Sequence, residues 1–141
     1  MDDELKRVNY GRVRVNMGRV GTDESDNGFE SDLNTVIHEM LHIFGVSQSL
    51  YNKFIDPKTG KYYSENDNVK EIFKTATIRG KKTYLLSSKN ILETARKYYG
   101  CPTLEGMQLE NDGAGGSMGS HWEKTIILNE LMTAESSGSE G

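Results

Sequence analysis

The sequence lacks the features that define several protein classes. It has 141 residues, a single cysteine, three histidines and a formal net charge of −4. A lone cysteine cannot close a disulfide within the chain, and the acidic balance argues against a nucleic-acid-binding surface. No stretch has the length and apolarity of a membrane span, and residues 1–4, Met-Asp-Asp-Glu, do not resemble a signal peptide.

Large apolar residues are also scarce. Leu, Ile, Val and Phe account for 30 of the 141 residues, which is near the lower edge for a chain that folds around its own core. The length allows one domain, and the apolar deficit indicates an incomplete one. Residues 134–141 are Ser, Gly and Glu with one Ala, a composition that predicts a flexible tail.

Two of the three histidines lie in an HExxH motif formed by His38, Glu39 and His42. On a helix, positions four apart share one face, so both imidazoles can turn toward one metal ion. Zinc in a hydrolase usually takes three protein ligands and leaves a fourth position for water, whose pKa falls toward about 7. Glu39 would then act as the general base. Because the motif fixes only three letters, the alternative is a surface helix with two solvated histidines.

The residues around the motif support a helix over 32–44. Ser31 is a suitable N-cap, Asp32 a first-turn acid and Gly45 the expected C′ residue. Apolar residues recur at intervals of three and four, which predicts that one side of the helix is buried. They are Leu33, Val36, Ile37, Met40, Leu41 and Phe44.

The residues alone leave the third ligand open. Position 48, three residues after the glycine, is where a compact metzincin pattern would supply it, but Gln48 is a poor zinc ligand. One candidate is His121, which could also be an ordinary loop histidine. The other is Glu93, since a second class of HExxH enzymes uses a glutamate from a later helix. Glu93 could equally be a solvated charge paired with Lys97 at i+4.

Further motifs follow the HExxHxxG segment at 38–45 in a fixed order. After a long insertion, a Cys-Pro-Thr-Leu-Glu-Gly segment begins at Cys101, and the chain then reads Gly-Ser-His-Trp-Glu at 119–123 and Glu-Leu-Met-Thr at 130–133. Together these ordered motifs resemble the leishmanolysin family, the surface metalloproteases of the metzincin clan. The resemblance extends from about Gly11 to Thr133.

This resemblance implies roles for five residues. His38, His42 and His121 would hold one zinc ion, and Glu39 would be the general base. Met132 would be the Met-turn residue, which packs beneath the metal without bonding to it. Taken without the resemblance, Met132 could be an ordinary core methionine at the end of an apolar run.

The expected fold class is α+β, an incomplete metzincin-like catalytic domain over residues 1–133 followed by the tail. Val13–Met17 alternates as a strand should, and a polar loop over 21–28 leads to the zinc helix. Residues 46–100 form the insertion. It should contain a turn at 56–60, a hairpin of Thr75–Ile78 and Thr83–Leu86 around a basic turn, and an amphipathic helix from Ser87 or Ser88 to Gly100.

The function expected from motif and resemblance is a zinc-dependent endopeptidase that acts on polypeptides. The alternative is a catalytically weak or inactive zinc-binding fragment or paralogue that serves as a surface interaction module. The resemblance implies an extracellular or cell-surface parent protein, with the disulfide partner of Cys101 outside this sequence. A reduced cytosolic thiol is the other interpretation. Nothing in the sequence indicates substrate preference or oligomeric state.

Overall fold

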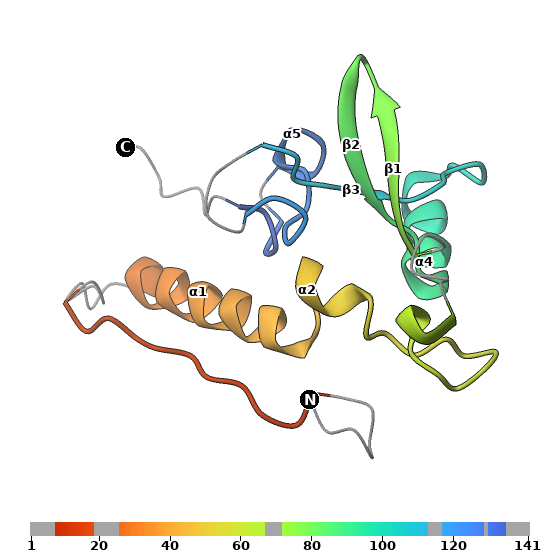
Figure 1. Cartoon of the computed structure of the whole chain (residues 1–141). Helices are drawn as coiled ribbons and strands as arrows, with labels where there is room; N and C mark the ends of the chain where they lie inside the picture. The colour runs from red at the N-terminus through yellow and green to blue at the C-terminus, as the bar shows by residue number, and fades with distance from the viewer. Residues whose placement is uncertain (1–7, 19–25, 67–71, 113–116, 129, 135–141) are drawn as a thin grey trace.

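The computed structural model describes residues 8–18, 26–66, 72–112, 117–128 and 130–134 (Figure 1). In chain order its elements are α1 (Asp26–Phe44), α2 (Gln48–Tyr51), the 3-10 helix η1 (Tyr63–Asn66), β1 (Phe73–Ile78), β2 (Lys81–Leu86), α4 (Lys89–Tyr99), β3 (Met107–Leu109) and α5 (Lys124–Ile127). This mixture of helices and a small sheet agrees with the predicted α+β class. None of the helices in these ranges combines the length and apolarity needed to cross a membrane.

The sheet has three antiparallel strands in the order β1-β2-β3. β1 and β2 form the predicted hairpin, with Ile78 paired to Lys81. The turn is tighter than expected, because only Arg79 and Gly80 lie between the strands, with φ of 52° and 80°. Positive φ at both central residues is the type I′ geometry that matches the twist of a hairpin.

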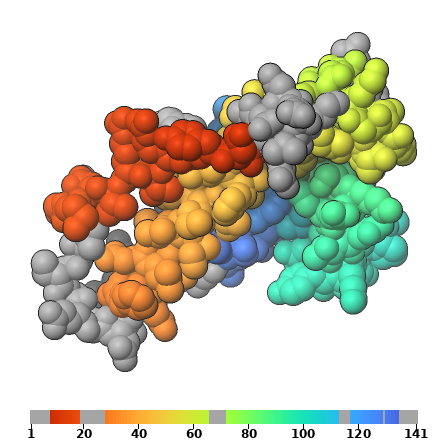
Figure 2. Space-filling view, turned by 90° about the horizontal axis from the view of Figure 1, so that it is seen from below, coloured from red at the N-terminus to blue at the C-terminus, as the bar shows by residue number. Residues whose placement is uncertain are grey.

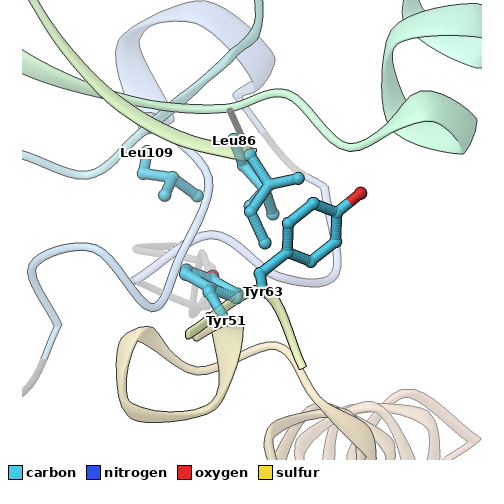
Figure 3. Packing of buried hydrophobic residues seen from close by; sticks show 5 residues of the cluster. Tyr51, Tyr63, Leu86 and Leu109 are labelled. Carbon is cyan, nitrogen blue, oxygen red and sulfur yellow. The ribbon is translucent and has the colours of Figure 1, made fainter. Parts of the chain in front are cut away.

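The buried core lies between the sheet and the segment that follows α1. Figure 3 shows side chains of this core approaching one another from β2, β3, α2 and η1. Its buried members are Tyr51, Tyr63, Ile72, Leu86 and Leu109. Trp122 packs against this cluster, so the core connects the sheet to the C-terminal segment that carries His121.

Two local predictions within residues 46–100 are confirmed. α4 begins after Ser88 and ends at Gly100, whose φ of 61° is left-handed, as expected for a glycine C-cap. At the predicted turn, the buried Asp56 carboxylate accepts hydrogen bonds from the Lys58 N–H and the Thr59 hydroxyl. Both features depend on contacts within a few residues, which is why the sequence indicates them.

The start of the HExxH helix differs from the prediction. α1 ends at Phe44 before Gly45 as expected, but it begins at Asp26 rather than near residue 32. Ser31 is therefore not a cap: it lies inside the helix, where its carbonyl accepts a hydrogen bond from the Thr35 hydroxyl. Once a helix has nucleated, extension through Ser or Asp costs only a few tenths of a kcal/mol per residue. The predicted loop over 21–28 lies partly outside the described residues, and the part from Asp26 is helical.

The predicted burial of one side of α1 is wrong within the described part of the chain. Leu33, Val36, Ile37 and Met40 are between 36% and 44% exposed, and Phe44 is 69% exposed. The core around Tyr51 is built from α2, η1 and the sheet. The apolar stripe of α1 is thus wider than the surface that covers it.

The predicted strand at Val13–Met17 is also not found. Residues 8–16 have no regular secondary structure and run along α1, as Figures 1 and 2 show from two directions. Gly11 lies directly against the Ile43 side chain. A strand needs a neighbour with unpaired backbone N–H and C=O groups, and a helix uses these groups internally. The alternating pattern therefore has no backbone to pair with here.

The core can be tested at Leu109, which is fully buried. Leu109→Ala should lower the free energy of unfolding by about 2–5 kcal/mol, because it removes apolar contacts and leaves a cavity. Leu128→Ala is the matched control, since Leu128 is 70% exposed and its truncation should change stability by no more than about 0.5 kcal/mol. Urea denaturation measures both. Equal losses in the two variants would contradict the placement of the core.

Candidate metal centre

α1 presents His38 and His42 on one face, one helical turn apart. The Nδ1 atom of His38 lies 2.7 Å from the Leu131 carbonyl oxygen, and Nδ1 of His42 lies 2.6 Å from the Val46 carbonyl oxygen. A carbonyl oxygen can only accept, so each Nδ1 carries the proton and donates it. This leaves the lone pair of each neutral ring on Nε2.

His121 reaches the same place from the other side. Its Nδ1 donates to the Ser117 carbonyl oxygen at 2.9 Å, which fixes the same tautomer. The backbone of His121 lies against the chain just after β3, because the Glu110 N–H donates to the His121 carbonyl oxygen. Leu109 and Trp122 form an antiparallel bridge, so His121 is held at the edge of the sheet.

The three Nε2 atoms converge. His38 and His121 are 3.1 Å apart at Nε2, and His42 lies 3.2 Å from each of them. With every Nδ1 protonated, these neutral rings have no Nε2 proton to share, so the contact brings three lone pairs together without a donor. A cation is the species that such an arrangement favours.

The geometry fits a zinc ion. A point about 2.0–2.1 Å from all three Nε2 atoms exists just outside their plane, and tetrahedral zinc would separate its nitrogens by about 3.3 Å, close to the distances found. Among the described residues, the three histidines form a group of potential metal ligands, because their ligand atoms all lie within 4.8 Å of one another.

Electrostatics keep His121 in the form that can bind a metal. Burial lowers the pKa of its imidazole below the usual value, because desolvation disfavours the charged ring. The hydrogen bond to Ser117 raises this pKa, the charges of His42 and His38 lower it, and the carboxylate of Glu39 raises it. The net direction is downward, so the neutral ring is favoured.

Glu39 follows the first histidine and faces open space. It is exposed and, with His42, lines a cavity of about 580 Å³ between α1 and the 8–18 segment. Other lining residues come from both walls and include Arg12, Arg14, Asp32 and Val36. Glu39 thus lines the same cavity as His42, but it is not one of the three residues whose ligand atoms converge.

The turn predicted to contain the Met-turn residue packs beside His121. Met132 is 3% exposed, and its carbonyl oxygen accepts a hydrogen bond from the Trp122 N–H. The Glu130 carboxylate accepts one from the Met132 N–H at 2.8 Å. Because Leu131 supplies the acceptor for His38, this turn connects both walls of the site.

Glu93 does not approach the histidine cluster. It lies on α4, where its carboxylate is 3.9 Å from the Lys89 ammonium and its side chain is 64% exposed. The predicted pairing with Lys97 is therefore replaced by the lysine one turn earlier. Exposed i,i+4 pairs of this kind contribute only a few tenths of a kcal/mol.

Sequence reasoning missed the groups that orient the imidazoles. The carbonyl oxygens of Val46, Ser117 and Leu131 have no sequence signal, because every residue has one. Ser120 and Glu130 lie within the motifs at 119–123 and 130–133, but the sequence did not indicate a role for either. For Glu130, its spacing two residues before Met132 suits a side-chain-to-backbone hydrogen bond within a turn, and this spacing could have indicated one.

An HExxH helix completed by a distant histidine, with a buried methionine in the adjoining turn, defines a protein with a candidate three-histidine metal centre. The chain belongs to the leishmanolysin family, whose family model matches residues 7–139. The resemblance seen in the sequence is thereby confirmed. No solved structure matches the chain.

The relatives are much longer than this chain. Leishmanolysin-like peptidase of Drosophila pseudoobscura pseudoobscura is 31% identical over 125 residues, which are 72% of this chain and 18% of the relative. The Caenorhabditis briggsae protein of the same name is 30% identical over 143 residues, or 84% and 22%. Leishmanolysin of Leishmania tropica is 31% identical over 103 residues, or 73% and 14%. The chain thus spans about a fifth or less of the length of these relatives.

The packing role of Met132 gives a stability test. Met132→Leu roughly conserves volume and should cost less than about 1.5 kcal/mol of unfolding free energy, whereas Met132→Ala should cost about 2–5 kcal/mol. Met17→Ala serves as control, because Met17 is 76% exposed and should change stability by less than about 0.5 kcal/mol. Thermal or urea unfolding measures all three. A Met132→Leu variant as damaged as Met132→Ala would show that the residue does more than pack.

Proposed function

We propose that this chain carries the metal centre of a zinc-dependent endopeptidase that hydrolyses polypeptides. The observation that carries the proposal is the convergence of three Nε2 lone pairs at 3.1–3.2 Å. Membership of the leishmanolysin family supports it, as do the peptidase names of the relatives.

The proposed ligands are His38, His42 and His121. Each ring is oriented by a backbone carbonyl through its Nδ1–H, the outer-shell arrangement that fixes tautomer and direction in histidine metal sites. Zinc in a site with three protein ligands supplies Lewis-acid chemistry and lowers the pKa of a water toward about 7. Three neutral imidazoles suit zinc better than magnesium or calcium, which prefer oxygen ligands.

Glu39 is the proposed general base. Its helical position next to His38 keeps the carboxylate near the cluster, and its exposure to the cavity lets it meet a substrate. In the proposed reaction, Glu39 takes a proton from the attacking water and then gives it to the leaving amine. The 8–18 segment forms the opposite wall of this cavity and would limit how a polypeptide enters.

The remaining assignments also follow from the family. We infer that residues 1–133 are part of a metzincin-like catalytic domain with an insertion at 46–100, and that Met132 is the Met-turn residue. Residues 135–141 of the predicted tail lie outside the described part of the chain. An extracellular or cell-surface location is proposed for the protein, with Cys101 as a partly exposed thiol that could pair with another cysteine in an oxidising compartment.

The ligand set predicts a contrast between two substitutions. His121→Ala should weaken zinc affinity by more than about 100-fold, since even the loss of a group that only orients a ligand costs 10–100-fold. Glu93→Ala, which removes an exposed charge on α4, should leave zinc affinity unchanged. Metal analysis and isothermal titration of the 141-residue chain measure both. Loss of zinc from the Glu93 variant instead would move the protein to the class with a glutamate ligand.

A second contrast separates base from ligand. Glu39→Gln removes the charge but keeps the shape, so it should keep zinc while lowering peptide turnover at least about 10²-fold. Turnover of a casein-type substrate and metal content are measured on the same preparations. Loss of metal would make Glu39 a ligand and exclude this mechanism. Tight zinc binding without peptide cleavage in the wild type would favour the interaction-module alternative.

A further inference from the structure

His121 has to meet its partners across a long stretch of chain. It is separated from His38 by 83 residues and from His42 by 79. A connection of this length restricts the position of His121 relative to α1 only weakly, because loop-closure entropy changes slowly with length. The third imidazole must therefore be placed by local contacts of its own segment.

One set of contacts ties this segment to the sheet. The Gly119 N–H donates to the Glu110 carbonyl oxygen, and the Glu110 N–H donates to the His121 carbonyl oxygen. These bonds fix the segment relative to β3. They do not by themselves fix it relative to α1, which carries the other two histidines.

Besides the turn at Leu131, which accepts a hydrogen bond from His38, a second contact connects this segment to the α1 side of the site. The backbone N–H of Gln48, the first residue of α2, donates to the Ser120 hydroxyl oxygen at 3.1 Å. Ser120 is 9% exposed and immediately precedes His121. Gln48 comes only four residues after the end of α1, so this bond joins the two halves of the site.

The side chain of Gln48 adds a fit by shape. A Cβ at Gly119 would lie 3.1 Å from both Cδ and Oε1 of Gln48, closer than ordinary contact. Gly119 also has a φ of 75°, a conformation that side chains other than glycine rarely adopt. Glycine at 119 therefore allows the Gln48 side chain to lie against the segment.

We propose that Ser120 is a positioning residue. By accepting the hydrogen bond from the Gln48 N–H, it docks the segment that carries His121 and so holds the His121 ring beside the rings of His38 and His42. The proposal rests on the proposed function, because its purpose is to complete the metal site. Residue 48 would thus contribute through its backbone, at the position where a compact pattern would have a metal ligand.

The test removes the two partners separately. Ser120→Ala deletes the acceptor. Gln48→Pro deletes the donor. The fold should tolerate this change, because proline suits the first position of a helix. Ser47 also has the extended conformation that a residue before proline requires, with φ −154° and ψ 135°. Each variant should bind zinc about 3- to 10-fold more weakly, as expected for one lost hydrogen bond. The double variant should lie within about 2-fold of the weaker single variant, since both changes break the same bond.

Two matched controls keep the bond. Gln48→Ala removes only the side chain, and Ser120→Thr keeps a hydroxyl, so both should bind zinc within about 2-fold of the wild type. Circular dichroism checks that all variants fold. If Ser120→Ala binds zinc like the wild type, or if the two single effects add in the double variant, the proposal is overturned.

A metal-free measurement separates this proposal from the proposed function. Trp122 is the sole tryptophan and adjoins His121, so its fluorescence reports on docking of the segment. In the metal-free chain, Ser120→Ala should shift Trp122 emission to longer wavelength and speed hydrogen exchange at the Gln48 amide, whereas Gln48→Ala should leave the emission unchanged. If Ser120→Ala changes neither the Trp122 emission nor the hydrogen exchange of the Gln48 amide, the docking is overturned. Absence of zinc binding in the wild type, with these changes present, contradicts the metal site alone.

Discussion

Each imidazole of the site donates its Nδ1 proton to a backbone carbonyl, and these three carbonyls belong to different parts of the chain. Val46 follows α1, Ser117 begins the segment of the third histidine, and Leu131 lies in the turn beyond α5. Because a carbonyl can only accept, the three bonds decide where the lone pairs are. The rest of the fold has to place these three acceptors together.

The sheet and its core accomplish this for the C-terminal half. β3 pairs with β2, Trp122 bridges to Leu109, and Thr133 bridges to Trp122. These backbone pairings connect the hairpin to the turn that contains Leu131. The small cluster around Tyr51 and Leu109 is thus connected to the candidate metal site through backbone pairing as well as through packing.

How well the sequence predicts an element depends on how far apart in the chain the residues that stabilise it lie. The hairpin, the turn at Asp56 and the helix that ends at Gly100 depend on neighbours within a few residues, and local patterns identified them. The strand expected at Val13–Met17 and the burial of the α1 stripe depend on which surface lies opposite. Alternation shows that a segment can be a strand, but pairing requires a second backbone, and the 8–18 segment lies along a helix.

The same division holds at the site. The sequence by itself determined that His38 and His42 share a helical face with Glu39 between them, because helical periodicity makes positions four apart neighbours. Family motifs indicated His121. Only the tertiary structure decided that His121 rather than Glu93 meets them, which tautomer each ring adopts, and that the Gln48 backbone contacts Ser120. The meeting of the three histidines, the tautomer of His38 and the Gln48–Ser120 bond depend on contacts 72 to 93 residues apart, which packing determines and local sequence does not encode. The carbonyls that fix the tautomers of His42 and His121 lie only four residues away, but whether they accept depends on how the rings turn in the folded site.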